Sequence, residues 1–398
     1  MSKIKFEKPF TQQEAIPEDA IAEAVKVMQS GRLHRYNLTP DEDGETNLLE
    51  VEYAKYQGAK YCLATTSGGT AMQIALRAVG AKPGDKILTN AFTLAPVPGA
   101  IAAVGGEPIF IETTQDLTID LEDLDAKFKS TDSKILLLSH MRGHIAPMEA
   151  LCEIACANNA VIIEDCAHTM GAEWNGIKSG NFGVIGCFST QTYKHMNSGE
   201  GGFLTTSDPD LMAKATILSG SYMMYEKQLA RPDMSDYALA RYEMPNCSSR
   251  MDNLRAAILR PQLKGLDHNI DRWNARYQVL EKAFQETQGL RVRERPQNEK
   301  YVGSSIQFLI PSWPQDKIDQ FVKNCFARGV ELKWFGNANP VGFTSRYDSW
   351  TYAPKQSLEK TIGILMQIMD MRIPLSFTEE DCALIGTIID EEFMALHG

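Results

Sequence analysis

The segment at residues 65–70, TTSGGT, combines small residues with the expected start of a helix. The apolar pattern from Ala71 to Ala78 predicts that this helix starts at Thr70. Small residues let backbone N–H groups approach an anion, and the N-terminus of a helix adds a positive dipole. The segment could therefore bind a phosphate, although serine and threonine before a helix are more often simple caps.

Asp165 ends the apolar run at residues 161–165, VIIED, and His168 follows it. The run predicts a buried strand, and open α/β sheets bind ligands at the carboxyl ends of such strands. An aspartate in this place can pair with a protonated ring nitrogen. Taken alone, the segment is better explained by a cap at the junction of strand and loop.

Lys194 precedes a glycine-rich turn in residues 189–202, STQTYKHMNSGEGG. A lysine amine can form a Schiff base if it is partly desolvated and loses its proton, whereas most lysines are solvated surface residues. The three segments gain meaning when they are taken together. A phosphate cradle, a carboxylate for a ring nitrogen and a lysine nucleophile are what pyridoxal phosphate needs from a protein.

The fold has to bring these three segments together. The apolar patterns predict an alternation of strands and helices that could do so. The expected strands are at residues 86–89, 108–112, 134–139, 161–165, 184–188 and 202–206. A helix pattern at residues 147–159 separates two of them, so the sheet is expected to be mostly parallel. Further helices are expected at residues 18–29, 48–56, 250–263 and 269–287.

The pattern changes towards the end of the chain. Strands are expected at residues 290–296 and 305–310, followed by helices at 315–328 and 358–369. We therefore predict a large domain over residues 1–280 and a small α+β domain over residues 281–398.

Composition excludes several classes of protein. The net charge of −11 argues against nucleic-acid binding as the main task, because an acidic surface repels phosphate backbones. No apolar run approaches the length of a membrane span, and the first ten residues, MSKIKFEKPF, lack the apolar core of a signal peptide. None of the eight cysteines forms a C-x-x-C pair. The protein is expected to be soluble and cytoplasmic.

Two histidines have a spacing that could bind a metal ion on a helix. They are His140 and His144, but Gly143 and Pro147 predict a loop in this region. Since no further ligand cluster is visible, no metal site is expected.

Five segments, in order, resemble the DegT/DnrJ/EryC1/StrS sugar aminotransferases. They are SGGTAMQIAL, IIEDCAHTMGA, FSTQTYKHMNSGEGG, SRMDNLRAAILRPQL and RIPLSFTEED. The family spacing Lys-x4-Gly-Glu-Gly-Gly selects Lys194 among the lysines. The resemblance implies an α/β fold of the aspartate-aminotransferase type, fold type I. Its large domain would hold a mostly parallel seven-stranded sheet, and a small α+β domain would follow.

The resemblance also implies pyridoxal 5'-phosphate as cofactor and assigns roles around it. Lys194 would hold it as a Schiff base, and Asp165 would pair with the ring nitrogen. His168 would lie near the ring hydroxyl. The phosphate would be held by three residues, Gly69, Thr70 and Ser189.

Two positions depart from the family pattern. Leu94 stands where the family usually has an aromatic residue that stacks on the cofactor ring. The family is usually a homodimer in which an asparagine reaches the phosphate of the other subunit. That position is Ser248 here, with Asn246 nearby.

The implied reaction moves an amino group from glutamate to a keto sugar. The segments SHMRGHIAP, STQTYKHMNSGEGG and PNCSSRMDNLRAAIL are most similar to the branch that makes 8-amino-3,8-dideoxy-manno-octulosonate for lipopolysaccharide. That acceptor carries a carboxylate, which loop residues would bind: Arg32, His34, Arg35 and Arg142. Solvated loop charges are an equally good explanation of these residues.

Other functions stay open. The chain could aminate a nucleotide-linked 3- or 4-keto sugar, an amino acid or an inositol. Related sugar dehydratases carry histidine in place of the Schiff-base lysine, and His195 lies next to Lys194. A regulator that binds pyridoxal phosphate without turnover is the alternative from a different class.

Overall fold

The computed structural model describes residues 4–397, and its centre is a seven-stranded sheet in the order β1-β9-β8-β5-β4-β2-β3. The strands are β1 (Tyr61–Thr65), β2 (Lys86–Asn90), β3 (Glu107–Ile111), β4 (Ile135–Ser139), β5 (Val161–Asp165), β8 (Ile185–Ser189) and β9 (Gly202–Thr206). Only β9 runs antiparallel to its neighbours. The predicted mostly parallel sheet is confirmed, and β1 is the strand that the sequence patterns missed.

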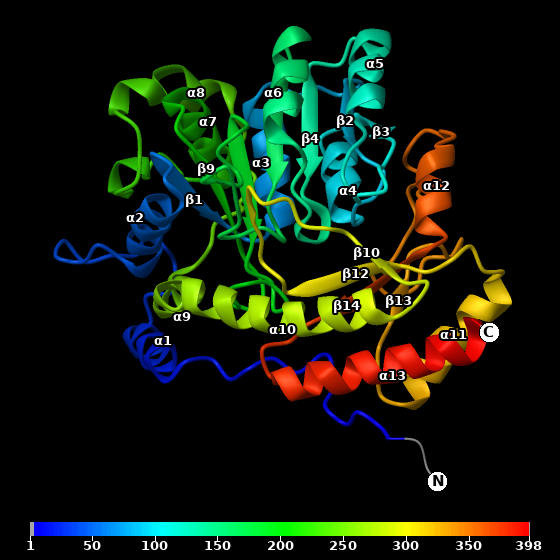
Figure 1. The fold of residues 1–398 in the computed structure, drawn as a ribbon. Helices are drawn as coiled ribbons and strands as arrows, with labels where there is room; N and C mark the ends of the chain where they lie inside the picture. Colours follow the sequence, from blue (N-terminus) through cyan, green and yellow to red (C-terminus); the bar gives the residue numbers. More distant parts are fainter. Residues whose placement is uncertain (1–3, 398) are drawn as a thin grey trace.

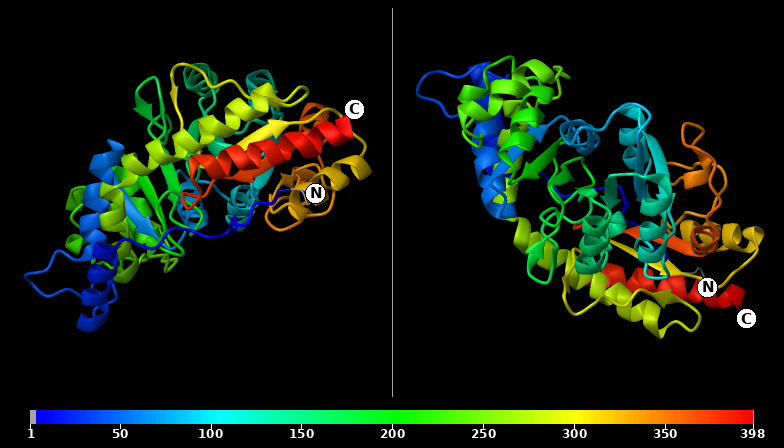
Figure 2. Two further views of the ribbon diagram at one scale, coloured as in Figure 1. Left: turned by 60° about the horizontal axis from the view of Figure 1, so that its bottom comes forward. Right: turned by 90° about the horizontal axis from the view of Figure 1, so that it is seen from above.

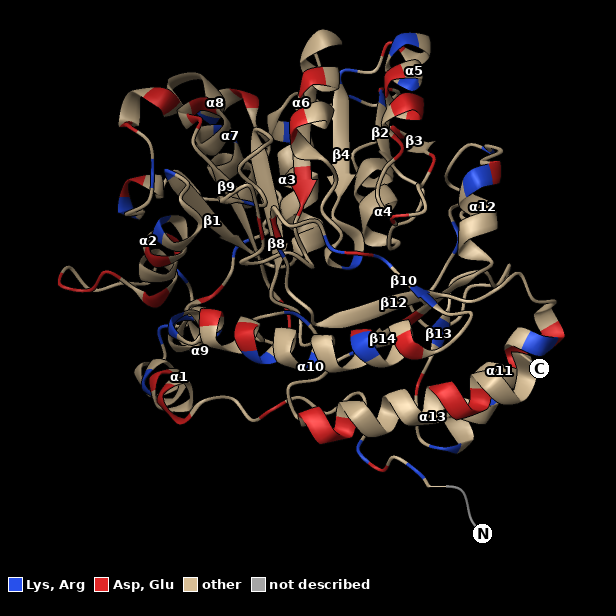
Figure 3. Cartoon of the chain, in the orientation of Figure 1, with Lys and Arg blue, Asp and Glu red and all other residues tan. Residues whose placement is uncertain are grey.

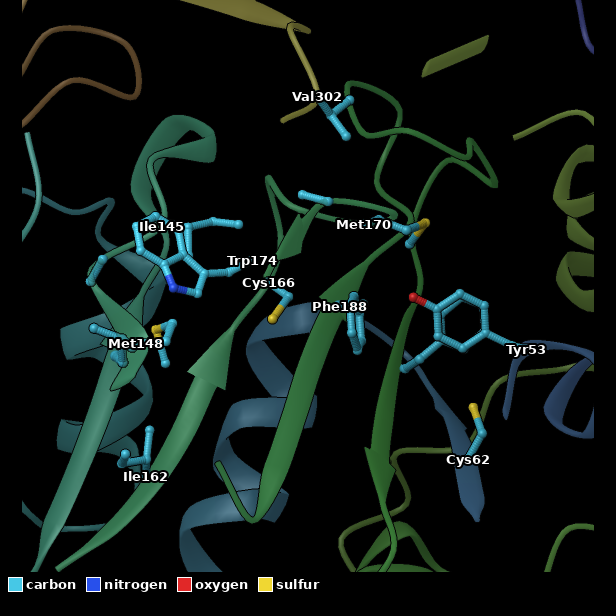
Figure 4. Close-up of a cluster of buried hydrophobic side chains, with 14 of the residues drawn as sticks. Tyr53, Cys62, Ile145, Met148, Ile162, Cys166, Met170, Trp174, Phe188 and Val302 are labelled. Atoms are coloured by element: carbon cyan, nitrogen blue, oxygen red, sulfur yellow. The ribbon is translucent and has the colours of Figure 1, made fainter. Parts of the chain in front are cut away.

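Side chains on most of the strands alternate between two apolar cores, one on each face of the sheet. On β8, for example, Phe188 belongs to one core and Cys187 to the other. Figure 4 shows part of the first core, where Phe188 and Tyr53 lie among Cys62, Cys166 and Met170. Both faces are buried, which explains why the strands are almost continuously apolar in sequence.

Helices cover both faces of this sheet (Figure 1). They are α2 (Glu45–Gln57), α3 (Gly68–Ala78), α4 (Pro96–Ala103), α5 (Leu121–Thr131), α6 (Met148–Ala157), α7 (Pro209–Ser219), α8 (Tyr237–Glu243) and α9 (Asn253–Lys264). The preceding helix α1 (Glu18–Ser30) packs on α9. The helices expected at residues 18–29, 48–56, 147–159 and 250–263 are confirmed within a few residues at each end.

A second, antiparallel sheet has four strands in the order β10-β12-β14-β13. Their bounds are β10 (Arg291–Val292), β12 (Ser305–Leu309), β13 (Lys333–Trp334) and β14 (Ile368–Arg372). One face packs against three helices, α10 (Leu266–Glu286), α11 (Gln315–Ala327) and α13 (Glu379–His397). The other face looks towards the carboxyl ends of the large sheet, where the short helix η1 (Met141–Gly143) contacts β12. Figure 1 shows this small sheet between the large sheet and α10.

The helix expected at residues 358–369 is shorter than predicted, since α12 covers only Glu359–Leu365. Residues 368–372 form β14 instead, in the middle of the small sheet. In this strand Met369 and Met371 face the core, whereas Asp370 and Arg372 alternate with them. That period of two is a strand signal, and the preceding helix pattern obscured it.

The N-terminal segment closes a further apolar core, the small-sheet core, which lies between the small sheet and helices α10, α11 and α13. Phe6 and Phe10 make edge-on contacts with Phe377, and the Phe6 N–H donates to the Arg328 carbonyl at 2.8 Å. Figure 2 shows this segment running beside α13. The proposed boundary between residues 280 and 281 lies inside α10, whose apolar residues from Tyr277 onward join the small-sheet core. The division into two domains stays a prediction.

Two further features of residues 4–397 bear on the expectations from composition. None of the helices there is both long and apolar enough to cross a membrane. Acidic residues are spread over the outer helices α5, α6 and α13 (Figure 3), in keeping with the negative net charge.

Candidate active site

A cavity of about 690 Å³ lies where β4, β5 and β8 end and α3 begins. It is where parallel sheets usually bind ligands, because loops and helix N-termini meet at this edge. Most of the predicted cofactor residues line it together: Gly69, Asp165, His168, Ser189 and Lys194. Arg142 and Leu94 also line it.

The first turn of α3 forms one wall of the cavity. Ser67 caps this helix, with its Oγ accepting the Thr70 N–H at 3.0 Å and lying 2.9 Å from Thr70 Oγ1. The helix starts at Gly68, two residues before the predicted start at Thr70. The first N–H groups of a helix have no partner within it, so those that the Ser67 cap does not take can bind an anion at this wall.

Glycine allows β9 to pass directly behind this turn. A Cβ atom on Gly202 would lie 2.5 Å from the Gly68 nitrogen, and a Cβ on Gly68 would lie 2.9 Å from Ser189 Cβ. Such distances are too short for any side chain. The close approach brings Ser189, at the end of β8, beside the helix N-terminus, as a phosphate cradle requires.

Asp165 is the last residue of β5 and is buried in the cavity wall. Its carboxylate accepts hydrogen bonds from Ser139 Oγ at 2.9 Å and from the Ala167 N–H at 3.1 Å. Burial raises the pKa of this carboxyl group, and the two hydrogen bonds and nearby Lys194 oppose that rise. A buried carboxylate held in this way favours a cationic partner such as a protonated ring nitrogen.

Lys194 and His168 face each other in the same cavity, with 2.8 Å between Lys194 Nζ and His168 Nε2. Burial lowers the pKa of Lys194 to about 7, and the positive charges of Arg142 and Arg372 contribute. Burial, together with the positive charges of Lys194 and Arg142, holds the pKa of His168 well below its usual value, so its ring is neutral. His168 Nδ1 accepts a hydrogen bond from the backbone N–H of Arg142 at 3.4 Å. The proton of the neutral ring is therefore on Nε2, which faces the lysine.

His195 points away from this pair. Its Nε2 lies 2.9 Å from Ser304 Oγ, and its ring packs edge-on against Trp273. Burial and the nearby Lys194 charge lower the pKa of His195 to about 3. The residue that enters the cavity at this point of the chain is therefore Lys194.

The basic loop at residues 32–35 does not reach the cavity of this chain. Arg35 is fully buried and forms an ion pair with Glu50, with Nη2–Oε2 2.8 Å, which argues against a substrate role that stays a prediction. The Arg35 guanidinium has to stay with Glu50, because leaving the buried Glu50 carboxylate without a cation would cost several kcal/mol. Arg32 pairs with Glu42, and the His34 ring packs against Tyr36. Substrate roles for these two residues stay predictions.

Ser248 lies outside the cavity, in an exposed segment. Its N–H donates to Asn246 Oδ1 at 2.9 Å, so the two residues that were considered for the phosphate of a second subunit are neighbours. Whether either of them has that role stays a prediction.

Three further cavity residues were not assigned from sequence: Tyr193, Phe343 and Arg372. Arg372 lies on the ring of Tyr193, with 3.9 Å between its Cζ and the ring centroid. The sequence held a pattern that could have pointed to Arg372, because charged residues alternate with methionines at residues 369–372. This pattern places Arg372 on the polar face of a strand, but only if the segment is predicted as a strand.

A buried cluster of His140, Glu164 and Cys166 has side chains close enough to share a metal ion. Its hydrogen bonds indicate a structural role. Glu164 accepts N–H groups from Gly180, Phe182 and Gly183, and its Oε2 lies 2.9 Å from His140 Nε2. The carboxylate thus anchors the turn before β8.

A model of the DegT/DnrJ/EryC1/StrS aminotransferase family matches residues 14–390. The chain belongs to this family. GDP-perosamine synthase of Caulobacter vibrioides is 31% identical over 225 residues, which are 56% of this chain and 57% of the relative. The dTDP-3-amino-3,4,6-trideoxy-alpha-D-glucose transaminase of Streptomyces venezuelae is 31% identical over 279 residues, 68% of this chain and 67% of the relative. The alignment thus spans little more than half of the first relative's length.

The solved structure of the aminotransferase from Psychrobacter cryohalolentis has a TM-score of 0.82 and 22% identity to this chain. The match covers 98% of this chain and 100% of that one. This likeness shows the fold, so the predicted aspartate-aminotransferase-like α/β class is confirmed.

Pyridoxal 5'-phosphate is the cofactor of this family member, and the cavity fits it. The first turn of α3 and Ser189 suit its phosphate. Asp165 suits its ring nitrogen, and Lys194 would supply the amine that binds it covalently. Leu94 in the cavity wall offers an apolar surface to a ring but no stacking.

Proposed function

We propose that this protein transfers an amino group from glutamate to the keto group of a sugar. The observation that carries the proposal is the buried pair of Lys194 and His168, facing Asp165 in one cavity. The names of the two relatives, a perosamine synthase and an amino-sugar transaminase, support a sugar as acceptor.

Pyridoxal phosphate would supply an electron sink that stabilises negative charge on the substrate carbon. Lys194 Nζ would move a proton between that carbon and the cofactor, as base and then as acid. A pKa near 7 suits both roles, because each protonation state is populated at neutral pH. Asp165 would keep the ring nitrogen protonated, and neutral His168 would orient the amine through its Nε2.

Lys194 in the cavity favours transamination over dehydration. In the related dehydratases histidine takes the place of the lysine, but His195 here is bonded to Ser304, away from the cavity. A regulator without turnover would not need a lysine with a pKa lowered to about 7, so we regard that alternative as the weaker one.

The substitution Lys194→Ala tests the proposal. We expect it to abolish amino transfer, and borohydride should fix no cofactor on the variant. In the wild-type protein, peptide mass spectrometry after borohydride treatment should find the cofactor on Lys194. The exposed Lys282 on α10 offers a matched control, since Lys282→Ala should change neither result. Normal turnover by Lys194→Ala, or cofactor fixed on another lysine, would contradict the proposal.

Two classes of acceptor have support. The relatives' names favour a nucleotide-linked 3- or 4-keto sugar. The cations Arg142 and Arg372 in the cavity wall favour an acceptor with its own carboxylate, such as the 8-keto precursor of 8-amino-3,8-dideoxy-manno-octulosonate, an amino sugar of lipopolysaccharide. Bleaching of the cofactor by glutamate, followed by recovery with each candidate keto sugar, separates the two classes.

We further propose a cytoplasmic homodimer. Exposed apolar side chains between α7 and α9 support a partner surface: Tyr222, Met223, Leu239 and Tyr242. Light scattering of the purified protein measures the oligomeric state directly.

A further inference from the structure

The face of the small sheet that looks towards the cavity carries charge. Lys333 on β13 pairs in register with Asp370 on β14, and Arg372 lies two residues further along β14. Side chains two apart on a strand, and those directly opposite on a neighbour, share one face. The opposite face, with Trp334, Met369 and Met371, belongs to the apolar core. The charged residues are thus placed by the pleat of the sheet.

Arg142 reaches this face from the large sheet. Its Nη2 donates to Asp370 Oδ2 at 2.7 Å, while Asp370 Oδ1 accepts from Gln307 Nε2 at 2.7 Å. Asp370 is fully buried, and both of its oxygens are engaged. The carboxylate of Asp370 therefore brings one negative charge to this face beside three positive ones, those of Arg142, Arg372 and Lys333.

Arg372 and Lys333 have no carboxylate within ion-pair distance among residues 4–397. Both lie on the ring of Phe343, with Lys333 Nζ 3.5 Å and Arg372 Cζ 4.5 Å from its centroid. Arg142 lies against the same ring at 5.3 Å. Burial lowers the pKa of Lys333 to about 8, and the neighbouring arginine charges contribute. The group thus holds an uncompensated positive charge around one aromatic ring.

The geometry of Arg142 points independently to a ligand. Its backbone has φ 55°, a left-handed conformation that is uncommon and costly for an arginine. Its side chain is about 5% exposed, and its Nε has no hydrogen-bond partner. A buried guanidinium N–H without an acceptor is costly unless a ligand supplies one.

We propose that Arg142, Arg372 and Lys333 form a subsite for the carboxylate of the sugar acceptor. This rests on the proposed function and narrows it to a sugar acid. Arg142 and Arg372 line the same cavity as Lys194, and Phe343 extends its wall towards Lys333. An acceptor held there by its acid group would present its keto group along the cavity to the amine.

A carboxylate suits this group better than a diphosphate does. The guanidinium fork matches the two oxygens of a planar carboxylate. Arg142 is buried, so the negative group that reaches it has to be the end of the ligand. The diphosphate of a nucleotide sugar lies in the middle of the molecule, with a nucleoside beyond it.

Binding to the holoenzyme, measured by isothermal titration calorimetry, tests the subsite without turnover. The probes are 3-deoxy-octulosonate, its neutral methyl ester, and uridine diphosphate. We expect the acid to bind at least tenfold more tightly than the ester. Arg372→Gln and Lys333→Gln should each remove most of this preference, and Arg372→Lys should retain part of it. Lys282→Gln, an exposed change on α10, should retain all of it.

Three results would overturn the subsite: equal binding of acid and ester, an unchanged preference in both glutamine variants, or tight binding of uridine diphosphate that these variants abolish. A rise in KM for glutamate alone would assign the cations to the amino donor and also overturn it. Cofactor absorbance in each variant shows whether the fold is intact. Failure of the proposed function would appear differently, as absence of cofactor fixed on Lys194.

Discussion

At the scale of single residues, the site depends on a lysine amine that is neutral near physiological pH. Because burial and two arginines lower the pKa of Lys194 to about 7, its unprotonated fraction rises between about pH 6 and pH 8 and then levels off. An ordinary lysine, with a pKa of about 10.4, continues to gain reactivity up to far higher pH.

Acetic anhydride labelling of the cofactor-free protein, read by peptide mass spectrometry, checks this prediction. Labelling of Lys194 should have a midpoint near pH 7, and the exposed Lys282 in the same digest serves as the internal reference. Arg142→Met should move the Lys194 midpoint upward, because it removes a nearby positive charge. Identical profiles for the two lysines would contradict the pKa shift.

At the scale of elements, the phosphate cradle depends on how closely β9 passes behind the first turn of α3. Gly202→Ala places a Cβ where the Gly68 nitrogen is now 2.5 Å away, so the turn has to move. We expect cofactor binding to weaken at least tenfold and stability to fall by about 1–3 kcal/mol, the usual cost of overpacking.

Equilibrium dialysis against pyridoxal phosphate and urea unfolding measure these two effects. Gly363→Ala in α12 is the matched control, because no atom lies within 4 Å of its new Cβ. It should leave cofactor binding unchanged and stabilise the helix slightly, by about 0.5–1 kcal/mol. Unaltered affinity in Gly202→Ala would show that the turn does not hold the phosphate.

At the scale of the whole molecule, the N-terminal segment joins the small-sheet core from the far end of the sequence. Phe10 is buried, and its ring centroid lies 4.9 Å from that of Phe377. Phe10→Ala should lower the free energy of unfolding by about 3–5 kcal/mol, as for other large-to-small changes in cores.

Urea unfolding of the holoenzyme, followed by circular dichroism, measures this loss. Ile4→Ala in the same segment is the control and should cost little, since Ile4 is 66% exposed. A comparable loss in both variants would mean that the segment acts through something other than burial. Cofactor absorbance of Phe10→Ala under native conditions should stay normal, because the segment does not line the cofactor cavity.

The sequence by itself determined the features that depend on neighbours along the chain. The period of apolar residues predicted six strands of the large sheet, which put Asp165 at a strand end and Gly69 at a helix start. Lys194 was selected by its spacing from the glycine-rich turn at residues 199–202, as in the family. Parallel strands bring their carboxyl ends to one edge, so these residues had to meet once the strands had formed.

Tertiary structure alone decided which charges belong to the site. In the sequence, Arg35 and Arg142 are both basic residues in predicted loops. In the structure, Arg35 is buried in an ion pair with Glu50, whereas Arg142, with its left-handed backbone, lines the cavity. Arg372 reaches the same cavity from a strand of another sheet, and Lys333, on the neighbouring strand, lies on the ring of Phe343 in the cavity wall. The partner of a charge is fixed by packing between distant segments, because only burial makes an ion pair or an unpaired cation energetically decisive.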